Sequence, residues 1–350
     1  MALKTQEVRV SNPSAPSLPV TGAPRNSSVS GANSTIRNYL LNRGSSAFAD
    51  RSFRWLMVLC ALSIFAIVAL IATELIVRSR PSIAKFGLHF FFGNAWDPVH
   101  GNYGALPFIY GTLVSSFLAL IIAVPLAIGL AIFLTEMCPR PLRAPLSFLT
   151  ELLAAIPSVV YGLWAIFVLV PILRNDVNPA LMRALGWTGL FTRPNFGIGM
   201  LAAGVILAIM ILPVISSLTR EVMTAVPYTQ REAVLALGAT RWEMIRMGVL
   251  RNARIGIVGS VILGLGRALG ETMAITMVIG NRPDILKNLL APAYSMASVI
   301  ANEFTEASDS MYLSALIEIG LALFLVTILV NALARLLVWA VTRGAPARVV

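Results

Sequence analysis

Long apolar stretches dominate the sequence, and short polar segments separate them. A helix that crosses a membrane needs about 20 mostly apolar residues, and six stretches reach that length: roughly 55–77, 106–135, 147–173, 196–219, 254–281 and 312–340. The pattern predicts an all-α membrane protein with about six transmembrane helices. We expect kinks at the prolines within these helices, where packed neighbours satisfy the freed backbone groups: Pro125, Pro157, Pro171 and Pro213.

Composition supports a lipid environment. The chain is 57% hydrophobic and 12% charged, whereas soluble domains are about 25% charged. The net charge of +11 raises the question of nucleic-acid binding. However, the basic residues are scattered between apolar runs and form no basic stripe with interleaved aromatic residues. We therefore expect membrane lipid and no nucleic acid among the partners.

The polar segments suggest three regions. Residues 1–50 are rich in Ser, Pro, Asn and Ala and predict a disordered cytoplasmic tail. Residues 51–105 predict the first transmembrane helix and an external loop. Residues 106–345 predict a core of five transmembrane helices with a cytoplasmic loop at 220–253.

The distribution of Lys and Arg predicts the orientation, because cytoplasmic loops carry more of them. With the N-terminus inside, eighteen lie in inner segments and eight in outer loops. We therefore expect both termini in the cytoplasm of a multi-pass protein of the cell membrane.

The predicted cytoplasmic loop contains signals for two short helices. Thr229 with Glu232, and Thr240 with Glu243, match the Ser/Thr-x-x-Glu capping box. Gly238 between them suits a left-handed residue that ends the first helix. These residues predict two helices joined at a glycine on the membrane face, and an amphipathic anchor without further function is an equally simple interpretation.

Glu232-Ala233-Val234 followed by Gly238 resembles the EAA-loop signature of ABC importer permeases. The resemblance implies a coupling helix that docks on a partner ATPase. Glu232, Ala233 and Gly238, with the capping residues Thr229, Thr240 and Glu243, are the candidate coupling residues.

A second mechanistic candidate lies in the fifth apolar stretch. Ser260, Gly264, Arg267 and Glu271 share one face of a continuous helix, so we expect both charges to point into the bundle. A charge in a membrane costs about 2.5–3.5 kcal/mol on insertion scales. Arg267 and Glu271 form either a neutralised structural pair or an anion-binding site, since Arg binds phosphate-like groups in a bidentate fork.

Gly-Arg-Ala-Leu-Gly-Glu-Thr at 266–272 and the segment 106–136 resemble phosphate-specific ABC permeases of the PstC type. The resemblance implies a type I ABC importer permease architecture (MetI-like) and phosphate as cargo. It also implies four partners: a PstA-type permease, two PstB-type ATPase subunits and an external PstS-type phosphate-binding protein. Arg267 and Glu271 then become substrate-pathway residues.

Two further carboxylates, Glu151 in the third stretch and Glu318 near the outer end of the sixth, are candidates for the pathway or for structural pairs. No P-loop and no hydrolase or kinase motif is present. We therefore expect no catalytic residues, no metal site and no cofactor, with ATP and Mg²⁺ bound by partner subunits. A permease for molybdate or sulfate and a gradient-driven anion transporter remain alternatives.

Overall fold

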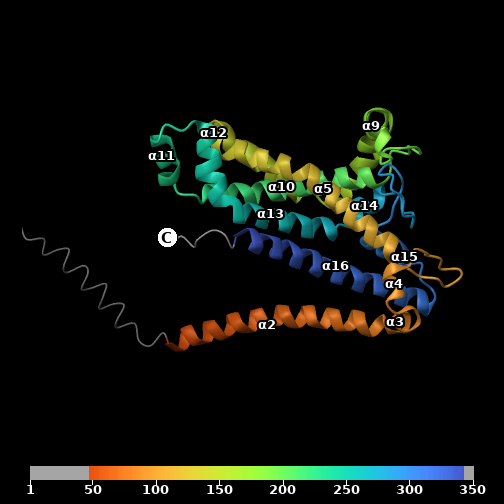
Figure 1. Cartoon of the computed structure of the whole chain (residues 1–350). Coiled ribbons are helices and arrows are strands. Elements are labelled where there is room, and N and C mark those ends of the chain that lie inside the picture. The colour runs from red at the N-terminus through yellow and green to blue at the C-terminus, as the bar shows by residue number, and fades with distance from the viewer. Residues whose placement is uncertain (1–46, 343–350) are drawn as a thin grey trace, which may run out of the picture. The chain divides into compact units, whose positions relative to one another are not determined.

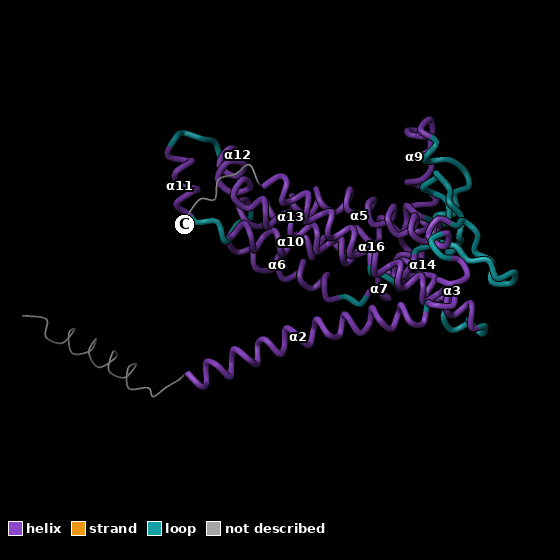
Figure 2. The backbone as a smooth tube through the Cα atoms, turned by 60° about the horizontal axis from the view of Figure 1, so that its bottom comes forward, coloured by secondary structure: helices purple, strands orange, loops and turns teal. Residues whose placement is uncertain are grey.

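The computed structural model describes residues 47–342, which are helices joined by loops (Figure 2). Six helical segments are long and apolar enough to cross a membrane: Asp50–Arg78, Leu106–Met137, Ser158–Thr188, Met200–Thr224, Arg241–Leu269 and Ser310–Ala340. This confirms the predicted all-α fold with six spans. Apart from its last four residues, the predicted tail lies outside the described residues, and the first described helix already begins at Ala47.

The contacts divide the chain into two units, residues 1–67 and 68–350, and the border falls within the first helix. All residues discussed below as sites belong to the second unit. The helical elements are α2 (Ala47–Arg78), α3 (Arg80–Phe86), α4 (His89–Phe92), α5 (Leu106–Ile132), η1 (Phe133–Met137), α6 (Arg140–Ala155), α7 (Ser158–Trp164), η2 (Ala165–Leu169), α8 (Val170–Ile172), η3 (Leu173–Val177), α9 (Asn178–Leu185), η4 (Gly186–Thr188), α10 (Met200–Thr224), α11 (Tyr228–Ala236), α12 (Arg241–Glu243), η5 (Met244–Leu250), α13 (Arg251–Leu269), α14 (Met273–Val278), α15 (Met296–Glu303) and α16 (Ser310–Thr342).

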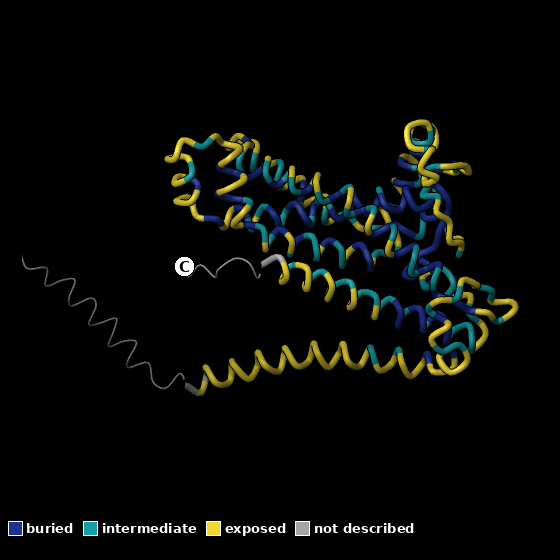
Figure 3. The backbone as a smooth tube through the Cα atoms, in the orientation of Figure 1, coloured by how far each residue is buried: buried dark blue, intermediate teal, exposed yellow. Residues whose placement is uncertain are grey.

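Helix α10 forms the centre of the second unit and packs against both α5 and α13 (Figures 1 and 3). The face of α5 toward the core carries small residues four positions apart: Ser115, Ala119, Ala123 and Ala127, all fully buried. Small side chains let helix backbones approach closely in membrane proteins. The bundle is therefore held by close packing of α5, α10 and α13.

The third span begins later than predicted. The stretch 147–173 was expected to be one kinked helix, but Ile156 is extended and Pro157 separates α6 from α7. Proline lacks an N–H and disfavours a helical conformation in the residue before it. Pro157 therefore ends a helix rather than kinking one. By contrast, Pro125 and Pro213 lie inside continuous helices, and Pro171 lies in the short helix α8 between two π-helical segments.

The fifth span is also displaced. It was predicted at 254–281, but α12, η5 and α13 form one helical run from Arg241 to Leu269 that ends at Gly270. A separate short helix, α14, follows the break. The second predicted short helix of the loop is thus the first turn of this span, and only residues up to Thr240 belong to the connecting loop.

Two opposite ends of the bundle carry the loops (Figures 1 and 2). One, which we call the α11 end, consists of α11, the start of α12, and the adjacent ends of α5 and α10. The other, the α9 end, contains α3, α4, α9 and the loops around α14 and α15. The candidate coupling residues lie at the α11 end.

Candidate functional site

The turn between α11 and α12 has the predicted chemistry. Gly238 has a φ of +83°, which is the left-handed region. Thr240 caps α12: its Oγ1 accepts a hydrogen bond from the Glu243 N–H at 3.3 Å, and Glu243 Oε2 accepts from the Thr240 N–H at 2.8 Å. The predicted glycine turn and the second capping box are confirmed.

The first predicted capping box is wrong. Helix α11 begins at Tyr228 after Pro227, so Thr229 is already inside the helix and makes no capping hydrogen bond. Proline sets the backbone angle for entry into the helix by itself. Within the described residues the exposed Glu232 side chain makes no hydrogen bond or ion pair, and it remains available to a partner.

The outward surface of α11 and α12 carries large apolar side chains among polar ones. Tyr228, Leu235, Leu237 and Trp242 are all exposed there, and Glu232, Ala233 and Arg241 are exposed beside them. Large exposed apolar side chains are typical of a protein-binding surface. The arrangement suits a helix that docks on another protein.

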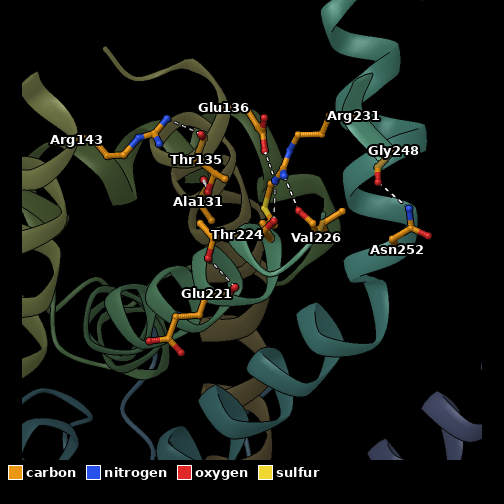
Figure 4. Close-up of polar contacts among 11 residues, drawn as sticks. Ala131, Thr135, Glu136, Arg143, Glu221, Thr224, Val226, Arg231, Gly248 and Asn252 are labelled. Carbon is orange, nitrogen blue, oxygen red and sulfur yellow. Dashed lines mark hydrogen bonds and ion pairs between the residues drawn. The ribbon is translucent and has the colours of Figure 1, made fainter. Parts of the chain in front are cut away.

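The inner side of α11 holds an ion pair that the sequence analysis missed (Figure 4). Arg231 is the buried residue of α11, and its Nη2 lies 3.1 Å from Oε1 of Glu136 in η1. Both side chains are only 8% exposed. Glu136 ends an apolar run, a position typical of a solvated carboxylate, yet the structure buries it. The available signal was that Arg231 lies three residues before Val234, on the face of α11 that packs against the bundle.

The same guanidinium also binds the end of α10. Its Nη2 donates to the carbonyl of Met223 at 2.8 Å, and its Nη1 donates to the carbonyl of Val226 at 2.5 Å. Carbonyls at a helix C-terminus lack helical partners and favour a cation. Arg231 therefore connects α11 to the ends of both α5 and α10.

A second contact holds α11 on the fifth span. Asn252 Nδ2 donates to Gln230 Oε1 and to the Gly248 carbonyl, both at 2.7 Å. A Cβ on Gly248 would lie 3.4 Å from Val234 Cγ2 and 3.5 Å from the Gln230 carbonyl oxygen. Helix α11 thus lies directly against η5.

Glu151 has a position different from the one predicted. It lies on α6, before the third span, and its Oε1 accepts a hydrogen bond from Nη2 of Arg220 at 2.7 Å. The carboxylate side chain is 56% exposed and its partner 18% exposed. Glu151 therefore joins α6 to α10 in a surface ion pair, and a role in the substrate pathway stays a prediction.

Arg267 and Glu271 are not an ion pair in the described residues. Helix α13 ends at Leu269, so Glu271 lies in the break before α14 and its Oε1 accepts a hydrogen bond from the Ala274 N–H at 3.4 Å. Arg267 is exposed, with no hydrogen bond or ion pair within residues 47–342. The expectation that both charges point into the bundle on one continuous helix is wrong.

The other two residues of the predicted face do pack inward. Ser260 Oγ lies 2.8 Å from Thr219 Oγ1 of α10. A Cβ on Gly264 would come within 2.6 Å of Ile215 Cγ1. The small residues therefore seat α13 on α10, while Arg267, one turn before the break, is left at the surface of the chain.

Glu318 of α16 is fully buried, and the buried Ser82 of α3 lies beside its carboxyl. The carboxyl lines no surface of the chain. Its pathway role stays a prediction.

The α9 end contains an aromatic cluster around Glu303. Trp96 Nε1 and the Tyr312 hydroxyl both donate to Glu303 Oε2, at 2.8 and 2.6 Å. Tyr294 lies nearby, and burial raises the pKa of its phenol far above the ordinary value, so it stays protonated as pH rises. These contacts fix the loop after α4 against α15 and the start of α16.

Comparisons with known proteins place the fold and the loop in one family. Residues 123–343 match the family described as "Binding-protein-dependent transport system inner membrane component". Among solved structures, a bacterial alginate ABC transporter in complex with an alginate-bound periplasmic protein has a chain with a TM-score of 0.54 at 16% identity, covering 83% of this chain and 96% of that one. A second alginate importer structure gives 0.52 at 18% identity, covering 85% and 100%. These two likenesses confirm the architecture of an ABC importer permease.

Relatives of known designation are closer in sequence. The phosphate transport system permease protein PstC of Mesorhizobium japonicum is 46% identical over 293 residues, 83% of this chain and 90% of the relative. That of Haemophilus influenzae is 47% identical over 290 residues, 82% and 92%. The probable PstC of Methanocaldococcus jannaschii is 35% identical over 274 residues, 77% and 87%. The chain is thus a multi-pass membrane permease component and belongs to the binding-protein-dependent inner membrane components, within their PstC branch of phosphate transport system permeases.

Proposed function

We propose that this chain carries inorganic phosphate inward as the permease subunit of an ATP-driven importer. The observation that carries the proposal is Arg267: a guanidinium in the fifth span that is exposed and makes no hydrogen bond or ion pair within residues 47–342. A lone cation facing lipid is costly. Its exposed side therefore faces a polar path, at the contact with a second permease subunit.

Phosphate suits this guanidinium. A planar fork of N–H donors matches two phosphate oxygens and forms short charge-assisted hydrogen bonds. Glu271 lies in the helix break that follows, close enough in the chain to repel a fully ionised anion and so limit how tightly it binds. The names of the PstC relatives support phosphate as the cargo.

The partners follow from the two surfaces. The outer side of α11 suits one of two PstB-type ATPases, and the other ATPase docks on the second permease. The surface around Arg267 suits that second permease, which is of the PstA type. An external PstS-type binding protein delivers the cargo at the α9 end. The α11 end then faces the cytoplasm, with both termini inside, as the distribution of Lys and Arg favours. Lipid covers the exposed apolar helices, and ATP and Mg²⁺ are bound by the ATPases alone.

The test is uptake of labelled phosphate by vesicles that contain the complete complex and its loaded binding protein. We expect uptake that needs ATP, stops when the ATPase is inactivated, and resists excess sulfate or molybdate. Competition by sulfate or molybdate would show that the transporter accepts that oxyanion as cargo and would contradict specificity for phosphate. Uptake that continues with an inactive ATPase would contradict the ABC mechanism and favour a gradient-driven transporter.

A further inference from the structure

Arg231 is unusual for a residue in an exposed loop helix. The other described residues of α11 are exposed or half-buried, yet the one that is buried carries a full charge. A buried charge is stable only with a partner and with its remaining donors satisfied. Here the partner, Glu136, comes from a segment 95 residues away in sequence. Two carbonyls accept from Nη1 and Nη2, and only Nε is buried without a partner among the described atoms.

Two of the partners of Arg231, Glu136 and Met223, belong to different spans. Glu136 lies in η1, which continues α5 and ends the span Leu106–Met137. Met223 lies in the last turn of α10. Among the described helices, α5 and α10 are the most closely associated pair. If α11 moves, Arg231 therefore pulls directly on the two helices at the centre of the core.

The ring of Tyr228 holds the guanidinium from the remaining side, with the Arg231 Cζ atom 4.9 Å from the ring centroid. A cation over an aromatic face is attracted by the ring. Carbonyls, carboxylate and ring together fix the guanidinium in one orientation. A side chain held in this way transmits movement instead of absorbing it.

We propose that the Arg231–Glu136 pair is the link through which movement of the coupling helix α11 reaches the second span, with Arg231 as a positioning residue for transport. This inference rests on the proposed function, because it requires that α11 docks on an ATPase. It goes beyond docking, since Arg231 points away from the exposed side of α11. Contact with η5 through Gln230 and Val234 seats the helix, and the ion pair connects it to α5.

The decisive variant is Glu136→Leu. It removes the carboxylate but leaves Arg231 its two carbonyl acceptors at the end of α10, where the helix dipole favours a cation. In vesicles with the complete complex we expect normal assembly, basal ATP hydrolysis within about twofold of wild type, and an unchanged KM for ATP. Stimulation of hydrolysis by phosphate-loaded binding protein and phosphate uptake should both fall by about tenfold, a typical size for coupling between sites.

A second variant, Arg231→Met with Glu136→Leu, removes both charges, so that no unpaired guanidinium is left buried. Apolar replacement of a whole buried pair is often neutral for stability. It should show the same loss of stimulation. The matched control is Glu74→Gln with Arg78→Met. It removes an ion pair within one helix, in which the side chain of Arg78 is 63% exposed and that of Glu74 is 54% exposed. The control should transport as wild type.

Three results would overturn the link. One is an assembled Glu136→Leu complex with normal stimulation and uptake, and another is an equal loss in the control. The third is failure of both test variants to assemble, which would make the pair structural. Failure of the proposed function is distinct, because the wild-type complex itself would then not take up phosphate.

Discussion

The α11 end and the fifth span each contain an arginine and a glutamate that could pair, but within the described part of the chain only the two at the α11 end form an ion pair. Arg231 and Glu136 come from distant segments and form a buried pair. Arg267 and Glu271 are close in sequence, yet a helix break separates them and no ion pair forms between them in the described residues. A buried ion pair between two helices favours a fixed mechanical connection, whereas an exposed cation without a partner favours a ligand.

The largest effect should come from Arg267→Lys, which keeps the charge but replaces the fork by a point charge. Hydrogen bonds to charged groups contribute about 1.5–3 kcal/mol each, so loss of the bidentate contact should lower phosphate uptake by about 100-fold. Assembly should remain normal, since Arg267 has no partner to strand among the described residues. Membrane abundance and uptake of labelled phosphate measure the two quantities, and normal uptake would remove Arg267 from the pathway.

Glu271→Gln should have the next largest effect, a fall in uptake of about tenfold, equivalent to about 1.4 kcal/mol. The amide oxygen can still accept from the Ala274 N–H, so α14 should keep its start. The sharper result concerns the double variant Arg267→Ala with Glu271→Ala. Because the two residues are not paired, removing Glu271 should not rescue Arg267→Ala. Rescue would show that they pair during transport.

Local signals account for what the sequence predicted correctly. Six apolar runs, a glycine turn at Gly238 and the Thr240–Glu243 cap each depend on residues near one another in the chain. The two displaced spans had local signals too, Pro157 and Gly270. The apolar character continues past both residues, and in a membrane either is tolerated inside a helix, so the hydrophobic pattern alone predicted uninterrupted spans.

The partner of Arg231 in the ion pair at the α11 end was beyond such reasoning. The position of Glu136 beside Arg231 depends on how α5, α10 and α11 meet, and no spacing in the sequence encodes that contact. Glu136 also follows an apolar run, which by itself indicates a solvated span end. Conversely, Arg267 and Glu271 have ideal helical spacing, but the pairing required a helix that continues through Gly270.

Gly238→Ala should have a smaller effect than either pathway change. A Cβ there would meet open space, so the cost is backbone strain alone, about 1 kcal/mol in the left-handed region. We expect stimulated ATP hydrolysis and uptake to fall by about fivefold with unchanged assembly. Gly238→Asn is the matched control, because Asn tolerates this conformation. Equal activity of the Ala variant would show that the turn need not be fixed.

Thr240→Ala removes the cap of α12 and should cost about 0.5–2 kcal/mol locally. Since η5 and α13 continue the helix and pack in the bundle, most of this loss should appear as fraying of α12 at the α11 end. Hydrogen exchange at residues 240–243 should rise, while uptake falls by about twofold. Thr240→Ser keeps the hydroxyl and should restore protection. Unchanged exchange in the alanine variant would contradict the capping role.

The smallest effect on uptake is expected for Glu318→Gln. This variant tests whether the buried Glu318, unlike the exposed Arg267, lies outside the path of the cargo. The Glu318 carboxyl is buried beside Ser82 and exposes no surface to a path for cargo. Glutamine has nearly the same shape and fits the same space. Uptake should stay within about twofold of wild type from pH 6 to 8, with assembly unchanged. A loss as large as that of Arg267→Lys in a fully assembled complex would instead show that α16 exposes Glu318 to the cargo during transport, as its place in the sequence first suggested.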